Sequence, residues 1–227
     1  GFVFYMHGER FGGFILCLGT GFLLACMAGW FRDVTHEAHH EDDHTKPVQV
    51  GLRVGFLVFI LTELMFFFAF FWAYFNASLF PSDVIGAIWP PASIKTLDPF
   101  RLPYLNTLLL LLSASSLTWA HGALEHDFDK KTVKAGLLIT ILLALTFMGV
   151  QTLEYSHASF KLSDGIYGSN FYLLTGFHGL HVLIGTIFLA VCYFRMHQFK
   201  QEQHVGFEAA AWYWHFVDVV WIFLFTV

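Results

Sequence analysis

Charged residues are scarce in this sequence of 227 residues, since Asp, Glu, Lys and Arg together make up only 13%. A soluble domain of average composition is about one quarter charged. Hydrophobic residues reach 56%, phenylalanine alone occurs 28 times, and the mean hydropathy is +0.60. The net charge of −5 provides no basic surface for nucleic acid. The composition therefore predicts a membrane protein.

Cysteine is also scarce, and its placement excludes two classes of site. Cys17, Cys26 and Cys192 all lie in apolar stretches, and no C-x-x-C pair occurs. Neither a disulfide framework nor a thiolate metal site is predicted. The apolar runs are continuous and lack period-two alternation, which excludes a transmembrane β-barrel.

Long apolar runs are what the sequence has instead. Six of them have about the 20 residues needed to cross roughly 30 Å of hydrocarbon. They cover residues 11–31, 48–80, 102–122, 132–153, 166–194 and 206–227. Residues 1–7 look like the end of another apolar segment and the last run reaches Val227 without a polar stop, so we expect a chain trimmed at both ends. The sequence predicts an all-α membrane protein with six full helices and part of a seventh.

Positive charge between these runs predicts their orientation. The connectors after the runs 11–31, 102–122 and 166–194 hold seven Lys and Arg residues, against four in the opposite connectors. The first set is Arg32, Lys46, Lys130, Lys131, Lys134, Arg195 and Lys200, and the second is Arg10, Lys95, Arg101 and Lys161. The excess favours the first set on the inner side of the membrane. The Pro-containing segment 81–103 is predicted to be a loop on the outer side.

Glu63, in LTELMFFFAFFW, lies deepest in an apolar run. An intramembrane carboxylate is costly, so this side chain should face protein or water. We expect either a neutral carboxyl bonded to a neighbouring helix or a group that exchanges protons. Arg53 lies nearer the inner end of the same run, where a lipid phosphate or a backbone carbonyl is its expected partner.

Three polar pairs share the i, i+3 spacing of one helix face. They are Glu154 with His157, His178 with His181, and His215 with Asp218. A carboxylate-bridged metal centre would need two E-x-x-H motifs and two further glutamates at one depth. Hydrogen bonding between helices is the expected role instead. Gly176, Gly179 and Gly185 beside the histidines predict close helix packing.

The stretch THEAHHEDDH (35–44) contains an H-E-x-x-H pattern. In a zinc protease, His36 and His40 would hold the ion and Glu37 would act as general base. An intramembrane metalloprotease needs a third ligand from a later helix, and Asp164 is a candidate. However, the pattern follows a span instead of lying within one, and four of its ten residues are histidine. A solvated acidic and histidine-rich loop is the competing interpretation.

Segments along nearly the whole chain resemble subunit III of the haem–copper cytochrome c oxidases. They are WFRDV (30–34), HTKPVQVGLRVGF (44–56), TELMFFFAFFWA (62–73), IWPPASI (88–94), LNTLLLLLSASSLTWAH (105–121), SDGIYGSNFYLLTGFHGLHVLIGTIFL (163–189) and HVGFEAAAWYWHFVDVVWIFLF (204–225). The resemblance implies a seven-transmembrane-helix bundle, with the first helix mostly missing here and a V-shaped, lipid-holding cleft between helices 1–2 and 3–7. It implies that residues 1–45 hold the end of helix 1, helix 2 and an inner-side loop, and that residues 46–227 form the five-helix bundle.

The resemblance also implies a role and a set of sites. Members are non-catalytic, bind no redox metal, pack on subunit I with subunit II in the same complex, and hold phospholipids. They support proton uptake and catalytic stability while the complex reduces oxygen with electrons from cytochrome c. Haem a and copper lie in the partner subunits, so only phospholipids and no metal are expected in this chain. Glu63 matches the family's carbodiimide-reactive glutamate. The positions that match lipid contacts are Trp30, Arg32, Glu37, His44, Arg53, Trp72, His181 and Arg195.

The histidine-rich stretch receives a second reading from this resemblance. Six of its side chains can bind and release protons near neutral pH. They are His36, His39, His40, Glu41, Asp42 and Asp43. We expect a proton reservoir for the uptake path of subunit I.

Two alternatives stay open besides the protease. Subunit III of a quinol oxidase usually lacks the first two helices, so the run 11–31 favours the cytochrome c type. A transporter could use Glu63 as a proton site, but it should show broken helices or internal symmetry. A bacterial plasma membrane and a mitochondrial inner membrane both fit the sequence.

Overall fold

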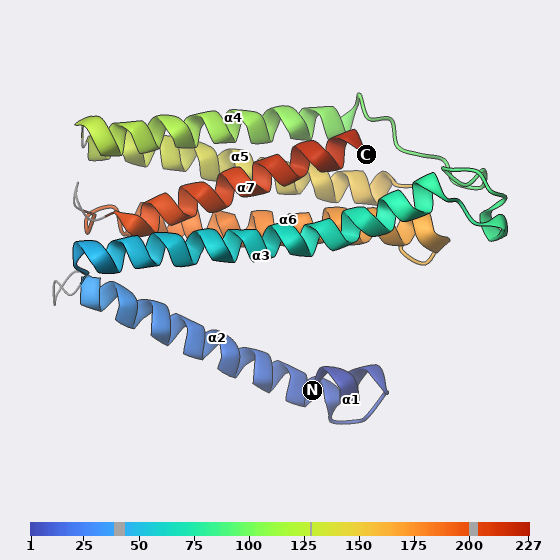
Figure 1. Ribbon diagram of the computed structural model, residues 1–227, viewed down its shortest axis with the longest axis horizontal. Helices are drawn as coiled ribbons and strands as arrows, with labels where there is room; N and C mark the ends of the chain where they lie inside the picture. Colours follow the sequence, from blue (N-terminus) through green and yellow to red (C-terminus); the bar gives the residue numbers. More distant parts are fainter. Residues whose placement is uncertain (39–43, 128, 200–203) are drawn as a thin grey trace. The chain divides into compact units, whose positions relative to one another are not determined.

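The computed structural model of this chain describes residues 1–38, 44–127, 129–199 and 204–227, and its regular structure there is entirely helical (Figure 1). The long helices are α2 (Gly12–His36), α3 (Lys46–Leu79), α4 (Leu102–Gly122), α5 (Lys130–His157), α6 (Gly165–Phe194) and α7 (Val205–Thr226). Each is long and apolar enough to span a membrane, with α4 counted together with the turn after it. The predicted helical membrane protein is confirmed. Residues 1–7 contain only the short helix α1 (Phe2–Met6).

Two helices extend beyond the apolar runs that predict them. α2 continues to His36 and α5 covers residues 130–157. An apolar run marks where the chain crosses hydrocarbon, whereas backbone hydrogen bonds carry a helix on into the polar interface. The predicted loop 81–103 is confirmed except for the short 3₁₀ helix η2 (Asp83–Ile85) and the first turn of α4.

Contacts between Cα atoms divide the chain into two compact units, Gly1–Gly51 and Leu52–Val227. The first unit contains α1, α2 and the start of α3. Gly12 is buried there because α1 crosses close beside it, with the Tyr5 nitrogen 2.3 Å from where a Cβ would stand. The V-shaped cleft and the domain division after residue 45 stay predictions.

In the second unit, α4 packs against α5 and α7, and α6 packs against α5 and α7. Glycine permits two of these contacts, as expected for membrane helices. A Cβ on Gly136 would stand 2.7 Å from Ala120 Cβ, and one on Gly185 would stand 3.0 Å from Trp214 Cε3. Gly176 and Gly179 have no such neighbour within 4 Å among the described residues, so the close packing predicted at these two glycines stays a prediction.

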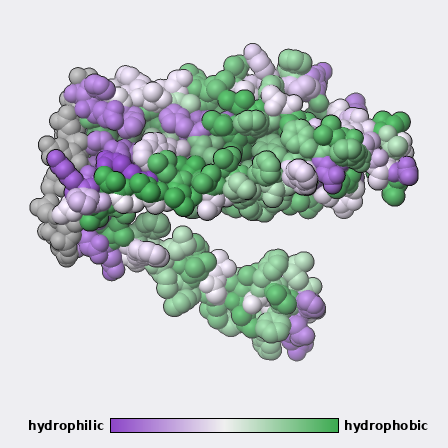
Figure 2. Space-filling view, viewed as in Figure 1, coloured by the Kyte–Doolittle hydropathy of each residue, from purple (hydrophilic) through white to green (hydrophobic). Residues whose placement is uncertain are grey.

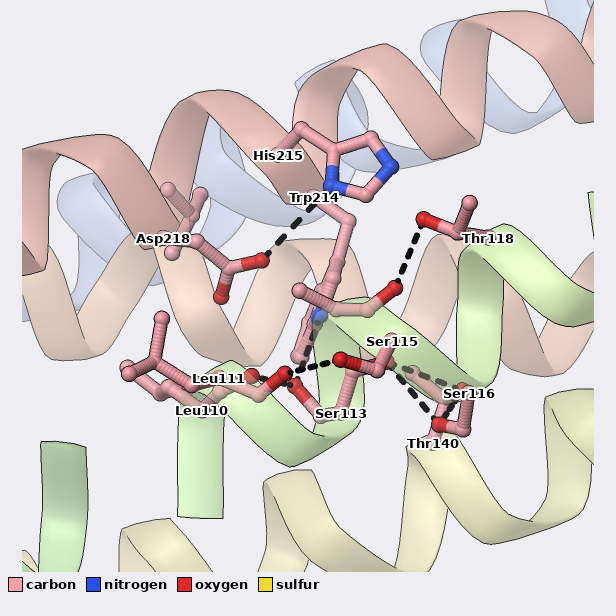
Figure 3. A network of polar contacts seen from close by, with 12 residues as sticks. Leu110, Leu111, Ser113, Ser115, Ser116, Thr118, Thr140, Trp214, His215 and Asp218 are labelled. Atoms are coloured by element: carbon pink, nitrogen blue, oxygen red, sulfur yellow. Dashed lines mark hydrogen bonds and ion pairs between the residues drawn. The ribbon is translucent and has the colours of Figure 1, made fainter. Parts of the chain in front are cut away.

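Polar side chains join these helices inside the core (Figure 3). Buried Trp214 of α7 donates its indole N–H to Ser113 Oγ of α4 at 3.0 Å. Ser116 of α4 and Thr140 of α5 share a hydroxyl hydrogen bond of 2.7 Å. Because hydrocarbon contains no water to satisfy a polar group, such pairs hold specific faces of the helices together.

α3 approaches α6 and α7 through long side chains. Its Phe56 ring lies 6.3 Å from the ring of Phe188 of α6, and its Phe59 ring stacks at 6.3 Å on Tyr213 of α7.

Other apolar side chains of α3 are exposed, for example Leu61 at 56%. Hydrophobic residues cover the middle of the face seen in Figure 2. This surface suits lipid tails or a partner subunit.

One end of the second unit gathers the part of α3 that directly follows Gly51, the end of α4 and the start of α7 (left in Figure 1). We call it the 53/121/208 end, after Arg53, His121 and Glu208. It is the end that the charge count predicts to be inner. At this end Asp129 caps α5, because its carboxylate accepts from the Thr132 hydroxyl and the Lys131 amide. These two donors hold the pKa of Asp129 below its usual value.

Candidate functional site

Glu63 of α3 and His181 of α6 form a pair within the apolar part of the second unit. Glu63 Oε2 lies 2.9 Å from His181 Nε2. The side chain of Glu63 is 24% exposed and that of His181 is 9% exposed. The carboxyl expected to face a neighbouring helix therefore does so. The sequence analysis treated the two residues as separate sites, and the structure brings them together.

The pair is enclosed by aromatic rings on the side of the histidine. The His181 ring lies 4.9 Å from the ring of Phe67 and stacks at 6.2 Å on the ring of Tyr213. Phe216 of α7 lies edge-on at 6.5 Å. These rings exclude water, so the hydrogen bond to Glu63 has little competition from solvent.

The hydrogen bonds of His181 determine how many protons the pair holds. Its Nδ1 lies 2.7 Å from the carbonyl oxygen of Phe177, which can only accept, so Nδ1 carries a hydrogen. Nε2 then either accepts from a protonated Glu63 or, as imidazolium, donates to its carboxylate. In both cases, one further proton lies between Glu63 and His181, and the pair is neutral overall.

His178, one turn away on α6, has a structural role. Its Nε2 donates to the Val217 carbonyl of α7 at 3.2 Å, and the residue is 1% exposed. The rings of Phe147 and Trp221 lie 5.8 and 5.1 Å away. The hydrogen bond between helices predicted for His178 is thus present.

For two other histidines, the predicted hydrogen bond to another helix is wrong, because each pairs within its own helix. His157 is exposed and its Nδ1 bonds to the Leu153 carbonyl of its own helix at 2.7 Å. His215 pairs at 3.8 Å with Asp218 of its own helix (Figure 3). The i, i+3 and i, i+4 spacings let polar groups bond within one helix as readily as between two.

Glu154 and Asp218 are the buried carboxyls of this group. They are 4% and 5% exposed. Glu154 Oε2 and both carboxylate oxygens of Asp218 lack a hydrogen-bond partner within the part of the chain that the structure describes. Their predicted structural role stays a prediction.

Arg53 has a different partner from the one that the sequence predicts. Its Nε and Nη2 donate to Glu208 Oε2 and Oε1 of α7, at 2.5 and 2.9 Å. This two-pronged ion pair takes the place of the expected backbone carbonyl, because a planar guanidinium fits one carboxylate with both donors. The lipid contact assigned to Arg53 stays a prediction.

The ion pair continues into a cluster that the sequence analysis missed. His204 Nε2 lies 3.2 Å from Glu208 Oε1, and His121 Nε2 lies 3.6 Å from Glu125 Oε1. Donor atoms of His121, Glu125 and His204 lie within 4.8 Å of one another. The signal was present in the sequence, because both pairs are His-x-x-x-Glu at the ends of apolar runs predicted to be on one side.

Several predicted lipid contacts lie on exposed surface. Trp30 and Trp72 are 74% and 67% exposed. Arg32 is exposed and bonds to neighbouring Asp33, with its Nη2 at 3.0 Å from Oδ1. Glu37 is exposed at the end of α2. These positions are accessible to lipid, and their role stays a prediction.

Three predicted lipid positions remain. His181 is buried in its pair with Glu63, and its lipid contact stays a prediction. The other two are partly buried. The His44 carbonyl accepts from the Gln49 amide at 3.0 Å. Arg195, at the end of α6, donates to Gln198 Oε1 at 2.8 Å. Burial lowers the pKa of Arg195, but a guanidinium stays charged. A charge held half-buried at a helix end could face a lipid headgroup.

The stretch around the H-E-x-x-H pattern is described only in part. His36 is the last residue of α2 and is exposed. His39, His40, Glu41, Asp42 and Asp43 lie outside the described residues. The zinc ligand set and the proton-collecting surface therefore stay predictions.

Comparison with known proteins relates this geometry to a family. The chain matches the family model "Cytochrome c oxidase subunit III" over residues 1–227. It is 57% identical to cytochrome c oxidase subunit 3 of Prototheca wickerhamii, over 100% of this chain and 87% of the relative. The identity is 56% with cytochrome c oxidase subunit 3 of Arabidopsis thaliana, over 100% and 86%. It is 53% with probable cytochrome c oxidase subunit 3 of Rickettsia felis, over 100% and 85%.

The membrane-spanning helices are what a membrane subunit of this family requires. The family match covers every residue of the sequence. The chain covers at least 85% of the length of each of these three relatives, and each is more than half identical to it. On this evidence the chain belongs to the cytochrome c oxidase subunit III family.

Proposed function

We propose that this chain is the non-catalytic subunit III of an aa3-type cytochrome c oxidase. It packs on subunit I, with subunit II in the same complex, and holds phospholipids. It supports proton uptake and catalytic stability while the complex reduces oxygen to water with electrons from cytochrome c. It binds no redox metal, since haem a and copper belong to the partner subunits.

Family membership carries the coarser part of this assignment. The chain is a subunit of an oxidoreductase complex whose haem and copper are carried by other subunits. Its membrane is the mitochondrial inner membrane or the bacterial plasma membrane. The names of the relatives favour cytochrome c over quinol as electron donor. The protease hypothesis rests on the H-E-x-x-H pattern with Asp164 as a third ligand, and family membership favours subunit III over it.

The Glu63–His181 pair is the observation that supports a role in proton handling. It holds one proton that can lie on either residue, and Glu63 is partly exposed at the surface of α3. Placing a carboxyl among apolar side chains costs free energy, so such a carboxyl marks a candidate functional site. A proton-holding pair at the lipid or partner surface is suited to buffering protons beside subunit I.

The exposed apolar face of α3 and the aromatic residues Trp30 and Trp72 support the lipid part. Tryptophan favours the headgroup region, where its ring is apolar and its N–H can bond. Arg32 adds a cation on the predicted inner side, although Asp33 shares its charge. Replacing Arg32 with Ala should therefore remove only part of an attraction to a lipid phosphate.

Glu63→Gln in the assembled oxidase tests the proton-handling role. Glutamine keeps the shape and can still bond to His181, but it cannot release a proton. We expect fewer turnovers before the enzyme loses activity, measured as oxygen consumption over time. Asp98→Asn, an exposed acid beside Arg101 in the outer loop, is the matched control and should behave as wild type. Equal lifetimes for all three enzymes, or a chain that purifies without a haem and copper subunit, would overturn the proposal.

A second experiment addresses the histidine-rich stretch 36–43. The six side chains named above as a proton-collecting surface are replaced together with Ser or Asn, and Glu37 is kept. If they collect protons, turnover should slow more at high pH than at low pH, because protons are scarcest there. An unchanged pH profile would refute the proton-collecting role and leave the rest of the assignment intact.

A further inference from the structure

The 53/121/208 end carries a group of ligands that the role of subunit III does not use. His121 belongs to α4, Glu125 to the π-helical turn η3 (Ala123–Asp127) that follows it, and His204 to the cap of α7. One donor atom of each lies within 4.8 Å of those of the other two. Segments far apart in the sequence thus bring two imidazoles and a carboxylate together.

The charges around His204 determine which nitrogen can bind a cation. Glu208 is held as a carboxylate by the two donors of Arg53, and His204 Nε2 lies 3.2 Å from its Oε1, so a hydrogen on Nε2 faces the negative charge. The neutral ring then has its lone pair on Nδ1. That atom is buried and has no hydrogen-bond partner among the described residues, and the residue is 8% exposed. Metal-bound histidines characteristically donate their other N–H to a carboxylate.

His121 presents a second nitrogen of the same kind. Its Nε2 is buried and makes no hydrogen bond within the described part of the chain. Glu125 Oε1 lies 3.6 Å from it, beyond hydrogen-bond distance but near the separation of two ligands on one ion. Buried polar atoms without a partner are rare and call for a ligand or an ordered water.

We propose that His121, Glu125 and His204 bind a divalent transition-metal ion, with zinc as the best match, and that the ion joins the end of α4 to the start of α7. Two imidazole nitrogens and one carboxylate are a zinc ligand set, whereas calcium and magnesium favour oxygen alone. Ligands around a tetrahedral zinc stand roughly 3.3 Å apart, given bonds of about 2.0–2.1 Å. The donor atoms, within 4.8 Å of one another, need to approach by up to about 1.5 Å, and the side chain of Glu125 is 47% exposed and can turn.

Zinc has no redox chemistry, so such a site is compatible with a non-catalytic subunit. The ion would complete a chain of contacts from Arg53 of α3 through Glu208 and His204 of α7 to His121 of α4. Binding to the folded state alone stabilises that state. This site departs from the expectation that the chain holds no metal, and it does not depend on the proton-handling role of Glu63.

The test counts zinc in the purified oxidase complex. Wild type, Glu125→Gln and His126→Gln complexes are stripped with a chelator and dialysed at micromolar buffered zinc. Bound metal is then measured by mass spectrometry. Glu125→Gln should hold one zinc fewer per complex than wild type. His126→Gln is the matched control, because His126 is an exposed histidine of the same turn outside the group, and it should hold the wild-type number.

Anomalous diffraction from wild-type crystals soaked in zinc locates the ion without any substitution. A peak between His121, Glu125 and His204 is expected. The proposal is overturned if that peak is missing, if wild type and Glu125→Gln hold equal zinc, or if the difference appears only at millimolar zinc. His121→Gln provides a second variant, which should also lose one zinc while the complex stays assembled.

Discussion

Trp214 donates its indole N–H to Ser113 Oγ at 3.0 Å, and this hydrogen bond joins α7 to α4 in the core of the second unit. Trp214 and Ser113 are both fully buried. The ring of Trp214 also fills the space that Gly185 of α6 leaves open. One tryptophan of α7 therefore contacts both α4 and α6, and Figure 3 shows its bond to Ser113.

Ser113→Ala should destabilise this core by about 1–2 kcal/mol, because it leaves a buried N–H without an acceptor. The temperature at which the subunit dissociates from the purified complex measures the effect. Ser115→Ala is the matched control, since Ser115 is exposed and bonds to the Leu111 carbonyl of its own helix. Equal dissociation temperatures for the two variants would show that the indole bond contributes nothing.

The spans were predictable because length and hydropathy alone determine whether a segment can cross hydrocarbon. All six apolar runs became helices, and the polar break at 81–103 became a loop. The caps were less predictable. Asp129 caps α5, which begins at Lys130, two residues before the apolar run. Hydropathy cannot detect such a boundary, which depends on hydrogen bonds at the helix terminus.

The pairings between helices could not be predicted in the same way. Glu63 and His181 are 118 residues apart, and Arg53 and Glu208 are 155 apart. α3 is apolar nearly all round, so its sequence does not indicate which face meets α6 or α7. Identifying Glu63 as an intramembrane carboxyl was possible because it is costly there, whereas identifying its partner required the packed structure.

Arg53→Leu and Glu208→Leu should each destabilise the subunit by roughly 1–3 kcal/mol, since each leaves one half-buried charge without its partner. The double variant should lose less than the sum, because no unpaired charge remains. Subunit dissociation temperatures of the three variants measure this coupling. The exposed pair of Arg101 with Asp98 is the control, and Arg101→Leu should have almost no effect. Strict additivity of the Arg53 and Glu208 effects would contradict the expectation.

Asp129 should make the stability of the α5 start depend on pH in one direction. Its pKa in the folded chain is below its usual value, so it adds stability above the unfolded pKa of about 3.9, and this is lost as the pH falls through the folded pKa. Asp129→Ala should therefore lower the dissociation temperature equally at about pH 6 and pH 8, and by less as the pH falls below about 4. Asp129→Asn keeps a capping group and should recover most of the loss. If Asp129→Ala lowers the dissociation temperature more at low pH than at neutral pH, the prediction is contradicted.

The proton held between Glu63 and His181 should be visible by infrared spectroscopy. In aromatic surroundings, a neutral carboxyl that donates to Nε2 avoids the solvation cost of an ion pair. We therefore expect a carbonyl band of a protonated carboxyl that disappears in Glu63→Gln. His181→Gln should shift this band without removing it, because the hydrogen bond changes while the carboxyl remains. Glu125→Gln is the control. Glu125 lies at the 53/121/208 end and is not part of the Glu63–His181 pair, so the band should stay unchanged. A spectrum identical in wild type and Glu63→Gln would place the proton on His181 as an imidazolium, and the pair would then be an ion pair that still holds one proton.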